Sequence, residues 1–190
     1  MLDRETADEF QTQLLRRIAT QDRQALTEFY DQTAAVLFST AVRILGDTHE
    51  AEEVVQDVFV QIWNKAAMFD GALGAPFHWA LGITRNRSID RLRARQRRTR
   101  ILESVTEETE QRPVSSSPQS NFALSEEELV HVRSAVKSLP QDQRQAIEMA
   151  FFAGLTHHEI ADALKEPLGT VKARIRRGML KLRDSLEAYV

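Results

Sequence analysis

One apolar stripe constrains the fold of this chain more than any other feature of its sequence. Residues 50–63, EAEEVVQDVFVQIW, repeat apolar side chains at helical spacing and leave acidic and amide side chains on the opposite face. No segment alternates convincingly enough to predict a strand. A second helix is indicated in residues 25–45, and Asp47 with Glu50 resembles a capping box between the two. We therefore predict an all-α protein.

The composition changes between residues 107 and 123, EETEQRPVSSSPQSNFA, where prolines and serines replace large apolar residues. This composition is typical of a linker. We predict two small helical domains, residues 1–102 and 125–190, joined by a flexible acidic linker over residues 103–124. Ser125 and Glu128 predict a capping box where the second domain begins.

Residues 154–183, GLTHHEIADALKEPLGTVKARIRRGMLKLR, predict a helix-turn-helix. Thr156 and Glu159 form a capping box at the start of the first helix. Pro167 cannot continue that helix, so a second one should begin near Gly169 or Thr170. Similar helix pairs also occur in protein-binding domains, so the motif alone does not prove DNA binding.

The second helix of this motif separates apolar from basic residues. Its predicted buried stripe is Val171, Ile175, Met179, Leu182 and Leu186. The residues predicted to face outward are Lys172, Arg174, Arg176, Arg177 and Lys181. Side chains near the start of a recognition helix reach base edges, and later ones more often meet phosphates. We expect Thr170, Lys172, Ala173 and Arg174 to be the base-facing group.

Charge is segregated along the chain, although its net value is only −3. Eight arginines lie between residues 85 and 100 against the single acid Asp90, and seven basic residues lie between 165 and 183 against Glu166. Two basic blocks separated by an acidic stretch indicate two contacts with polyanions. The alternative is a pair of solvated helix faces.

The first basic block follows a loop marked by Gly71, Gly74 and Pro76. Its helix carries Trp79 near the start and polar residues that include Arg85, Asn86, Arg87 and Arg91. An aromatic side chain beside arginines suits unpaired nucleotide bases, which stack as well as attract charge. Trp79 fits this role and a core position equally well.

The composition argues against several functional classes. The chain has no cysteine and only five scattered histidines, so we predict neither a metal site nor a cofactor. It lacks a Gly-rich phosphate loop and a plausible nucleophile–base pair, so we do not expect an enzyme. No apolar run approaches the roughly 20 residues of a membrane-spanning helix, and acids precede any apolar stretch at the N-terminus. We expect a cytoplasmic protein that does not insert into membranes.

Three motifs in order, AEEVVQDVFVQIW, FHWALGITRNRSIDRLR and LPQDQRQAIEMAFFAGLTHHEIADALKEPLGTVKARIRRGMLKLR, resemble bacterial RNA polymerase sigma factors of the extracytoplasmic-function (ECF) type. The resemblance covers nearly the whole chain. It implies that the first domain binds polymerase and reads the minus-ten element, and that the second reads the minus-thirty-five element. It also implies that the acidic linker runs through the polymerase channel that later holds RNA.

The resemblance also implies roles for individual residues. The surface for the polymerase clamp would comprise Glu53, Gln56, Asp57 and Gln61. The minus-ten site would comprise Phe69 and the loop that follows it to Phe77, where a flipped base is accepted, together with Trp79, Arg85, Asn86, Arg87 and Arg91. The minus-thirty-five site would comprise Thr170, Lys172, Ala173, Arg174, Arg176 and Arg177. The chain departs from the family at Ala173, where serine is common, and at Gly82, where a larger residue is usual.

The partners implied are core RNA polymerase, promoter DNA and an anti-sigma factor that could be membrane-anchored; in the holoenzyme the protein would lie at the nucleoid. The alternative function is a free-standing helix-turn-helix regulator that binds duplex DNA without polymerase. That alternative leaves the acidic-faced helix of residues 50–63 and the Trp79 helix without a purpose.

Overall fold

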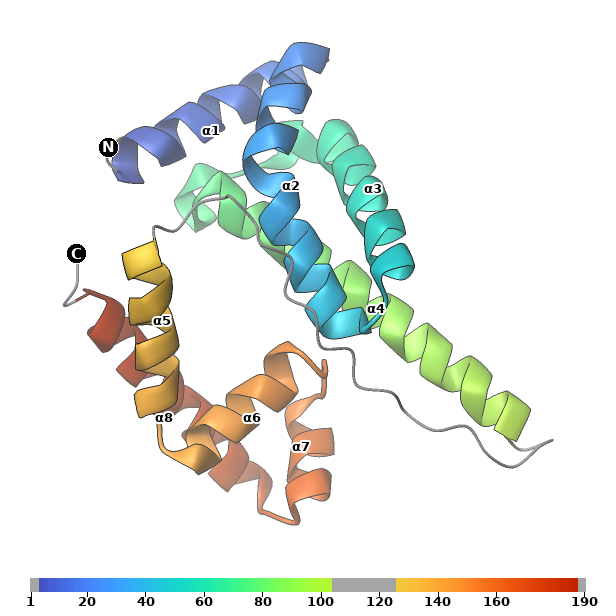
Figure 1. Ribbon diagram of the computed structural model, residues 1–190, viewed down its shortest axis with the longest axis vertical. Coiled ribbons are helices and arrows are strands. Elements are labelled where there is room, and N and C mark those ends of the chain that lie inside the picture. The colour runs from blue at the N-terminus through green and yellow to red at the C-terminus, as the bar shows by residue number, and fades with distance from the viewer. Residues whose placement is uncertain (1–3, 104–125, 188–190) are drawn as a thin grey trace. The chain divides into compact units, whose positions relative to one another are not determined.

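The computed structural model describes residues 4–103 and 126–187. The first range belongs to one compact unit and the second range to another (Figure 1). Every element in those two ranges is helical, so the all-α prediction is confirmed. The predicted linker beyond Glu103, with its proposed path, and the Ser125–Glu128 capping box lie outside the described residues and side chains.

Within residues 4–103, the first unit contains four α-helices and two short 3₁₀ helices. Their bounds are α1 (Arg4–Ala19), α2 (Arg23–Leu45), α3 (Thr48–Lys65), η1 (Ala66–Met68), η2 (Gly71–Leu73) and α4 (Pro76–Glu103). Helix α2 packs against α1, α3 and α4. The predicted apolar stripe of α3 is confirmed, since its residues from Ala51 to Ile62 enter the core and Trp63 packs against it from the edge.

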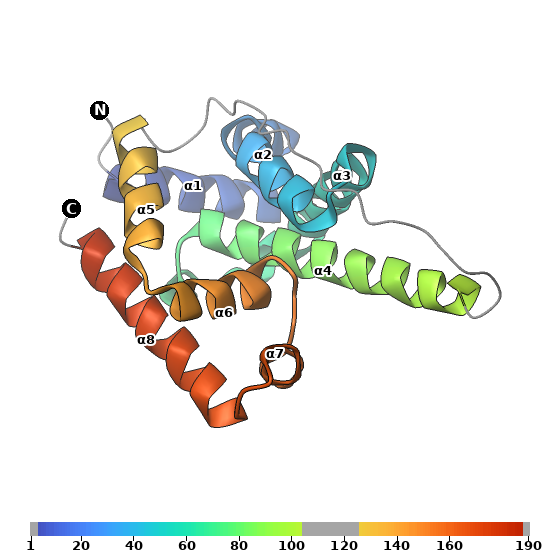
Figure 2. The same ribbon diagram turned by 60° about the horizontal axis from the view of Figure 1, so that its bottom comes forward.

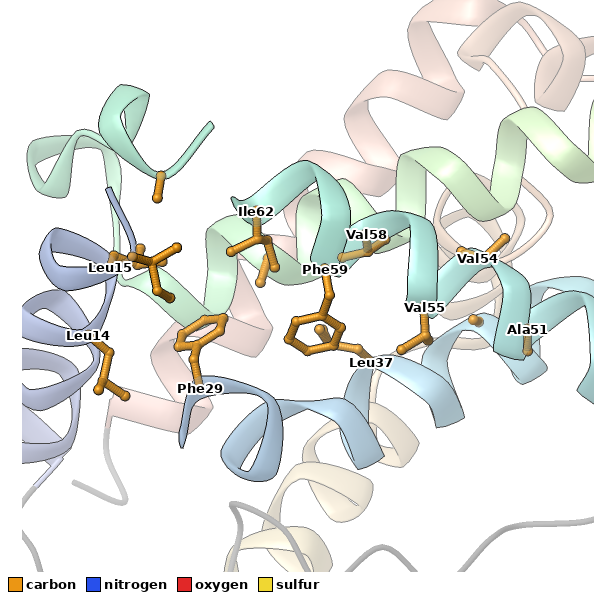
Figure 3. Packing of buried hydrophobic residues seen from close by; sticks show 14 of the residues in the cluster. Leu14, Leu15, Phe29, Leu37, Ala51, Val54, Val55, Val58, Phe59 and Ile62 are labelled. Carbon is orange, nitrogen blue, oxygen red and sulfur yellow. The ribbon is translucent and has the colours of Figure 1, made fainter. Parts of the chain in front are cut away.

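Helix α1 contributes to this core, although the sequence analysis did not predict it. Its Leu14, Leu15 and Ile18 are 0–1% exposed. Figure 3 shows Leu14 and Leu15 near Phe29 of α2 and in the same layer of apolar side chains as Ile62 of α3. The spacing of the three aliphatic residues places them on one face of α1, so a local signal for this helix is present in the sequence.

Short turns join α1 to α2 and α2 to α3. Asp22 caps α2 by accepting hydrogen bonds from the backbone N–H groups of Gln24 and Ala25. Gly46 ends α2 with a left-handed φ of 68°, and Asp47 caps α3 through a 2.9 Å bond from the N–H of Glu50. The second half of the predicted capping box is wrong, because the Glu50 carboxylate pairs with Arg95 instead.

The second unit contains α5 (Glu126–Ser138), α6 (Gln141–Phe151), α7 (His157–Leu164) and α8 (Leu168–Glu187). Figure 2 views α7 along its axis, with α8 running away from the short turn that joins them. The capping box is confirmed: Glu159 N lies 3.2 Å from Thr156 Oγ1, and Thr156 N lies 2.6 Å from Glu159 Oε2. Lys165 ends α7 in a left-handed conformation, with φ of 53°.

The turn and the buried face of α8 differ slightly from prediction. Helix α8 begins at Leu168, where the carbonyl of Pro167 accepts the first backbone bonds. Met179 was predicted to be buried and is 53% exposed, so that prediction is wrong. Gly178 occupies the buried position, because α6 approaches so closely that a Cβ there would lie 2.6 Å from Ile147 Cδ1. Met179 is about 100° further round the helix and faces outward.

Within the described ranges, no helix has both the length and the apolar content needed to cross a membrane. In the same ranges, no group of three or more His, Asp or Glu side chains could hold a metal ion.

Candidate nucleic-acid interface

A series of arginines joins α4 to α3. Arg87 Nε donates to Gln61 Oε1 across 3.1 Å, and Arg91 is bonded to Glu53. Arg95 Nη1 lies 3.0 Å from Glu50 Oε2, and its Nη2 donates to the carbonyl of Leu45 across 2.8 Å. The three arginines are four residues apart and therefore share one face of α4. We call these contacts the α3–α4 ladder.

The α3–α4 ladder connects residues that the sequence analysis assigned to different partners. Glu53 and Gln61 were assigned to polymerase, and their bonding partners Arg91 and Arg87 to minus-ten DNA. The other polymerase residues, Gln56 and Asp57, are exposed. Asp57 also lines a groove of about 370 Å³ between the two helices, together with the arginines of the ladder. Sequence spacing missed Glu50 and Arg95, because a contact between two helices leaves no periodic pattern.

Trp79 lies at the edge of the core and contacts the predicted base-binding loop. Its ring is partly buried, packs against the core cluster and lies 5.6 Å from the ring of Phe69, centroid to centroid. Leu73 in the same loop is 88% exposed. Met68, the residue immediately before the loop, is 76% exposed. An aromatic pair therefore lies close to two apolar side chains that are open to solvent, and sequence reasoning did not single out Met68 or Leu73.

Further along α4, polar groups face solvent. Asn86 is exposed, and Arg85 is partly buried beside it. Burial, with a smaller contribution from the positive charge of Arg93, lowers the pKa of Arg85 from its usual value. At Gly82 an added Cβ would meet nothing within 4 Å, so the glycine found there in place of a larger residue opens no gap in the packing.

Helix α8 presents a basic surface. Lys172, Arg176 and Arg177 are exposed, whereas Thr170 and Ala173 are partly buried. Arg177 is held along the helix by a 3.2 Å bond from its Nε to the carbonyl of Ala173. The structure thus brings five of the six predicted minus-thirty-five residues onto or beside the solvent-facing side of one helix.

Arg174 is the exception, and the prediction that it faces outward is wrong. Its side chain is 19% exposed. The Nε atom lies 3.0 Å from Asp142 Oδ2 at the start of α6, and Nη2 lies 3.0 Å from Glu166 Oε1 in the α7–α8 turn. Arg174 follows the buried Val171 by three residues, so it lies beside the buried face, where two carboxylates compensate its charge.

The fold and these surfaces define a helix-turn-helix DNA-binding protein that carries a second helical domain. Family models match both units: "Sigma-70 region 2" over residues 29–98 and "Sigma-70, region 4" over residues 135–184. The chain belongs to the ECF RNA polymerase sigma factors. It is 35% identical over 177 residues to the ECF RNA polymerase sigma factor SigK of Mycolicibacterium vanbaalenii, covering 91% of this chain and 87% of the relative.

A second relative belongs to the same family. The ECF RNA polymerase sigma factor SigK of Mycobacterium tuberculosis H37Rv is 33% identical over 174 residues, which cover 92% of each chain. Among solved structures, the chain is similar to the sigma factor RpoE in complex with the anti-sigma factor NepR from Bartonella quintana, at 24% identity and a TM-score of 0.38 over 80% of this chain and 90% of that one. It is also similar to CnrH in complex with the cytosolic domain of CnrY, at 23% identity and a TM-score of 0.40 over 94% and 98%.

Proposed function

We propose that this sigma factor directs core RNA polymerase to specific promoters through three surfaces, two of which adjoin on the first unit. It acts as an initiation factor and has no catalytic activity of its own. The observation that carries the proposal is the pairing, in one chain, of a helix-turn-helix whose Lys172, Arg176 and Arg177 face solvent with a helical unit that has its own arginine-rich helix. Each basic helix would meet one promoter element.

The polymerase surface lies on α3. Asp57 and Gln56 are exposed there, and Val60, one turn beyond Gln56, is 61% exposed. These three side chains would together form a contact surface with an aliphatic centre and polar neighbours. Glu53 and Gln61 would border this contact through their bonds to α4.

The minus-ten surface comprises the loop from Phe69 to Phe77, the Trp79 ring, and the polar side of α4 at Arg85 and Asn86. The Phe69–Trp79 pair gives the loop a fixed wall, and an unpaired base could stack against such a wall. Arg87 and Arg91 would act from the groove beside α3, where their charges reach both a strand of DNA and the polymerase-facing acids.

The minus-thirty-five surface is the exposed side of α8. Thr170 and Ala173 lie near its start, so they would approach base edges in the major groove together with Lys172. Arg176 and Arg177 lie one turn further along and would meet phosphates. Arg174 is excluded from this surface by its pairs with Asp142 and Glu166.

We further propose that an anti-sigma factor covers the α3 surface when the protein is inactive. The exposure of Gln56, Asp57 and Val60 supports this, because the residues proposed to meet polymerase are open to solvent in the free protein and therefore accessible to a competing partner. The sigma factor would then reside in the cytoplasm, and at the nucleoid once it is released to polymerase. Purification from the native host under non-inducing conditions tests this: recovery only as free or polymerase-bound protein would contradict it.

Run-off transcription tests the main proposal. Purified core polymerase is given a pool of promoter fragments with and without this chain. We expect the chain to select a subset of promoters and to bind them tightly only when polymerase is present. A free-standing regulator would instead bind the same duplexes equally well without polymerase, and that result would overturn the proposal.

A further inference from the structure

Arg174 connects three parts of the helix-turn-helix unit. It lies in the second turn of α8, and its guanidinium contacts Asp142 in the first turn of α6 and Glu166 in the turn between α7 and α8. Both contacts are 3.0 Å long and use different nitrogens of one planar group. Such a geometry fixes the direction of α8 more strictly than a single ion pair, because the rigid guanidinium must satisfy both carboxylates at once.

The neighbouring basic residues of α8 do not share this arrangement. Lys172 and Arg176, two residues before and after Arg174, lie about 200° round the helix from it and are exposed. Arg174 is the least exposed of the three, and both of its partners belong to its own unit. One of the four residues predicted to read bases is therefore directed into the protein.

We propose that Arg174 is a positioning residue: it sets the angle and register of α8 against α6 and the α7–α8 turn, so that Lys172 and Arg176 meet the upstream promoter duplex. Asp142 and Glu166 share this role, although both are acids in a DNA-binding domain. The proposal rests on the proposed function, in which the exposed face of α8 reads the minus-thirty-five element. It replaces the base-reading role that the sequence indicated for Arg174.

The two possible roles of Arg174 predict opposite effects when its acidic partners are neutralised. If Arg174 contacts DNA, Asp142 and Glu166 compete with DNA for it, so removing their charges frees the arginine and tightens binding. General electrostatics favours the same direction, since two fewer negative charges repel the phosphates less. If Arg174 positions α8, removing its partners releases the helix and weakens binding despite the more favourable net charge.

The experiment compares two double variants in the full chain, assembled with core polymerase. Asp142→Asn with Glu166→Gln removes both partners of Arg174. Asp162→Asn with Glu148→Gln makes the same charge change at two exposed positions of α7 and α6 that do not contact Arg174. Binding is measured on promoters with and without the upstream element, chosen beforehand with the unmodified holoenzyme. We expect the first variant to bind the element-containing promoter about tenfold more weakly and the control to bind it equally or more tightly.

Binding of the first variant that equals or exceeds that of the control would overturn the positioning role. Thermal melting of the free chain checks that both variants are folded at the assay temperature. If the double variant is not folded, Asp142→Asn alone retains the Glu166 pair and should give a smaller loss in the same direction.

Base preference gives a readout that a loss of stability would not change. Arg174→Lys keeps the charge but cannot hold both carboxylates with one planar group. Selection from randomised upstream elements should then return the same preferred bases as the unmodified protein, with weaker discrimination at all of them. Loss of preference at a single base pair would show that Arg174 reads that base. If the unmodified holoenzyme itself ignores the upstream element, the proposed function fails before this inference is reached.

Discussion

The Nε atom of Arg87 on α4 donates a hydrogen bond to Oε1 of Gln61 on α3 across 3.1 Å. A residue assigned to promoter DNA is thus bonded to one assigned to polymerase. One turn further along α4, Arg91, also assigned to promoter DNA, is bonded to Glu53, also assigned to polymerase. The two proposed binding surfaces of the first unit therefore share a line of polar contacts between α3 and α4.

Arg87→Ala should consequently impair two steps. We expect weaker opening of the minus-ten region, because a positive charge near the strand is lost, and also weaker assembly with core polymerase, because Gln61 loses the bond that orients it. Open-complex formation and gel-filtration assembly measure the two steps separately. Arg97→Ala, at an exposed position of the same helix, is the control and should leave assembly unchanged.

Asp57→Arg should impair assembly with polymerase while the fold is retained. Asp57 is exposed on α3, so the core loses little, but the sign of a proposed contact charge is reversed and like charges across an interface reduce affinity. Circular dichroism checks the fold and gel filtration with core polymerase checks assembly. Asp31→Arg on α2 makes the same change away from this surface. If the two variants assemble with polymerase equally well, Asp57 does not lie in the polymerase contact.

Arg176→Ala should weaken binding of the holoenzyme to promoters that depend on the upstream element. A phosphate contact should weaken all sequences alike and reduce the salt dependence of binding, whereas a base contact should cost about 1–3 kcal/mol of discrimination at one position. Lys181→Ala removes an equal charge later on α8 and should have the smaller effect. Unchanged transcription from such promoters would exclude Arg176 from the reading face.

Two glycines in helices should respond in opposite ways to alanine. At Gly82 the added Cβ enters open space, so Gly82→Ala should raise the free energy of unfolding by about 0.5–1 kcal/mol through helix propensity. At Gly178 the Cβ would lie 2.6 Å from Ile147 Cδ1 and 3.2 Å from Gln143 Cβ, so Gly178→Ala should lower it by about 1–3 kcal/mol. Thermal or urea unfolding of each variant measures both changes, and shifts of the same sign would contradict the packing described for α8.

Thr156→Ala should destabilise α7 by about 1 kcal/mol, because it removes the acceptor for the N–H of Glu159 and breaks the capping box. Hydrogen exchange of the amides in the first turn of α7 should become faster. Thr156→Ser keeps the hydroxyl and should restore most of the protection. Equal exchange in the alanine and serine variants would show that the cap contributes nothing to the stability of the helix.

Local signals in the sequence predicted local structure well. The apolar spacing of α3 and the Thr156–Glu159 pair each depend on residues within one or two helical turns, so periodicity and capping rules apply directly. The same rules located the end of α7 before Pro167 and the start of α8 to within a residue or two. They also placed Gln56, Asp57, Lys172 and Arg176 on solvent-facing positions.

Contacts between helices could not be predicted in this way. Nothing in the sequence indicates that Arg174 forms an ion pair with Asp142, 32 residues earlier, or that Arg95 forms one with Glu50. Gly178 was likewise overlooked as a buried residue, because only the close approach of α6 makes a missing side chain necessary there. Charge on a helix was interpreted as exposure, and for Arg174 the acids of neighbouring elements reverse that interpretation.

Each unit of this protein encloses an apolar cluster of its own, one from α1 to α4 and the other around Ile160 and Val171, and among the described residues none belongs to both. Changes to the interior of one unit therefore need no matching change in the other. A lineage could exchange residues 126–187 for those of a relative by recombination and so change the proposed upstream preference in one step, while the first unit, with its proposed polymerase surface on α3, stays as it was. Because the two cores are separate, one proposed promoter contact can change in evolution while the other is kept.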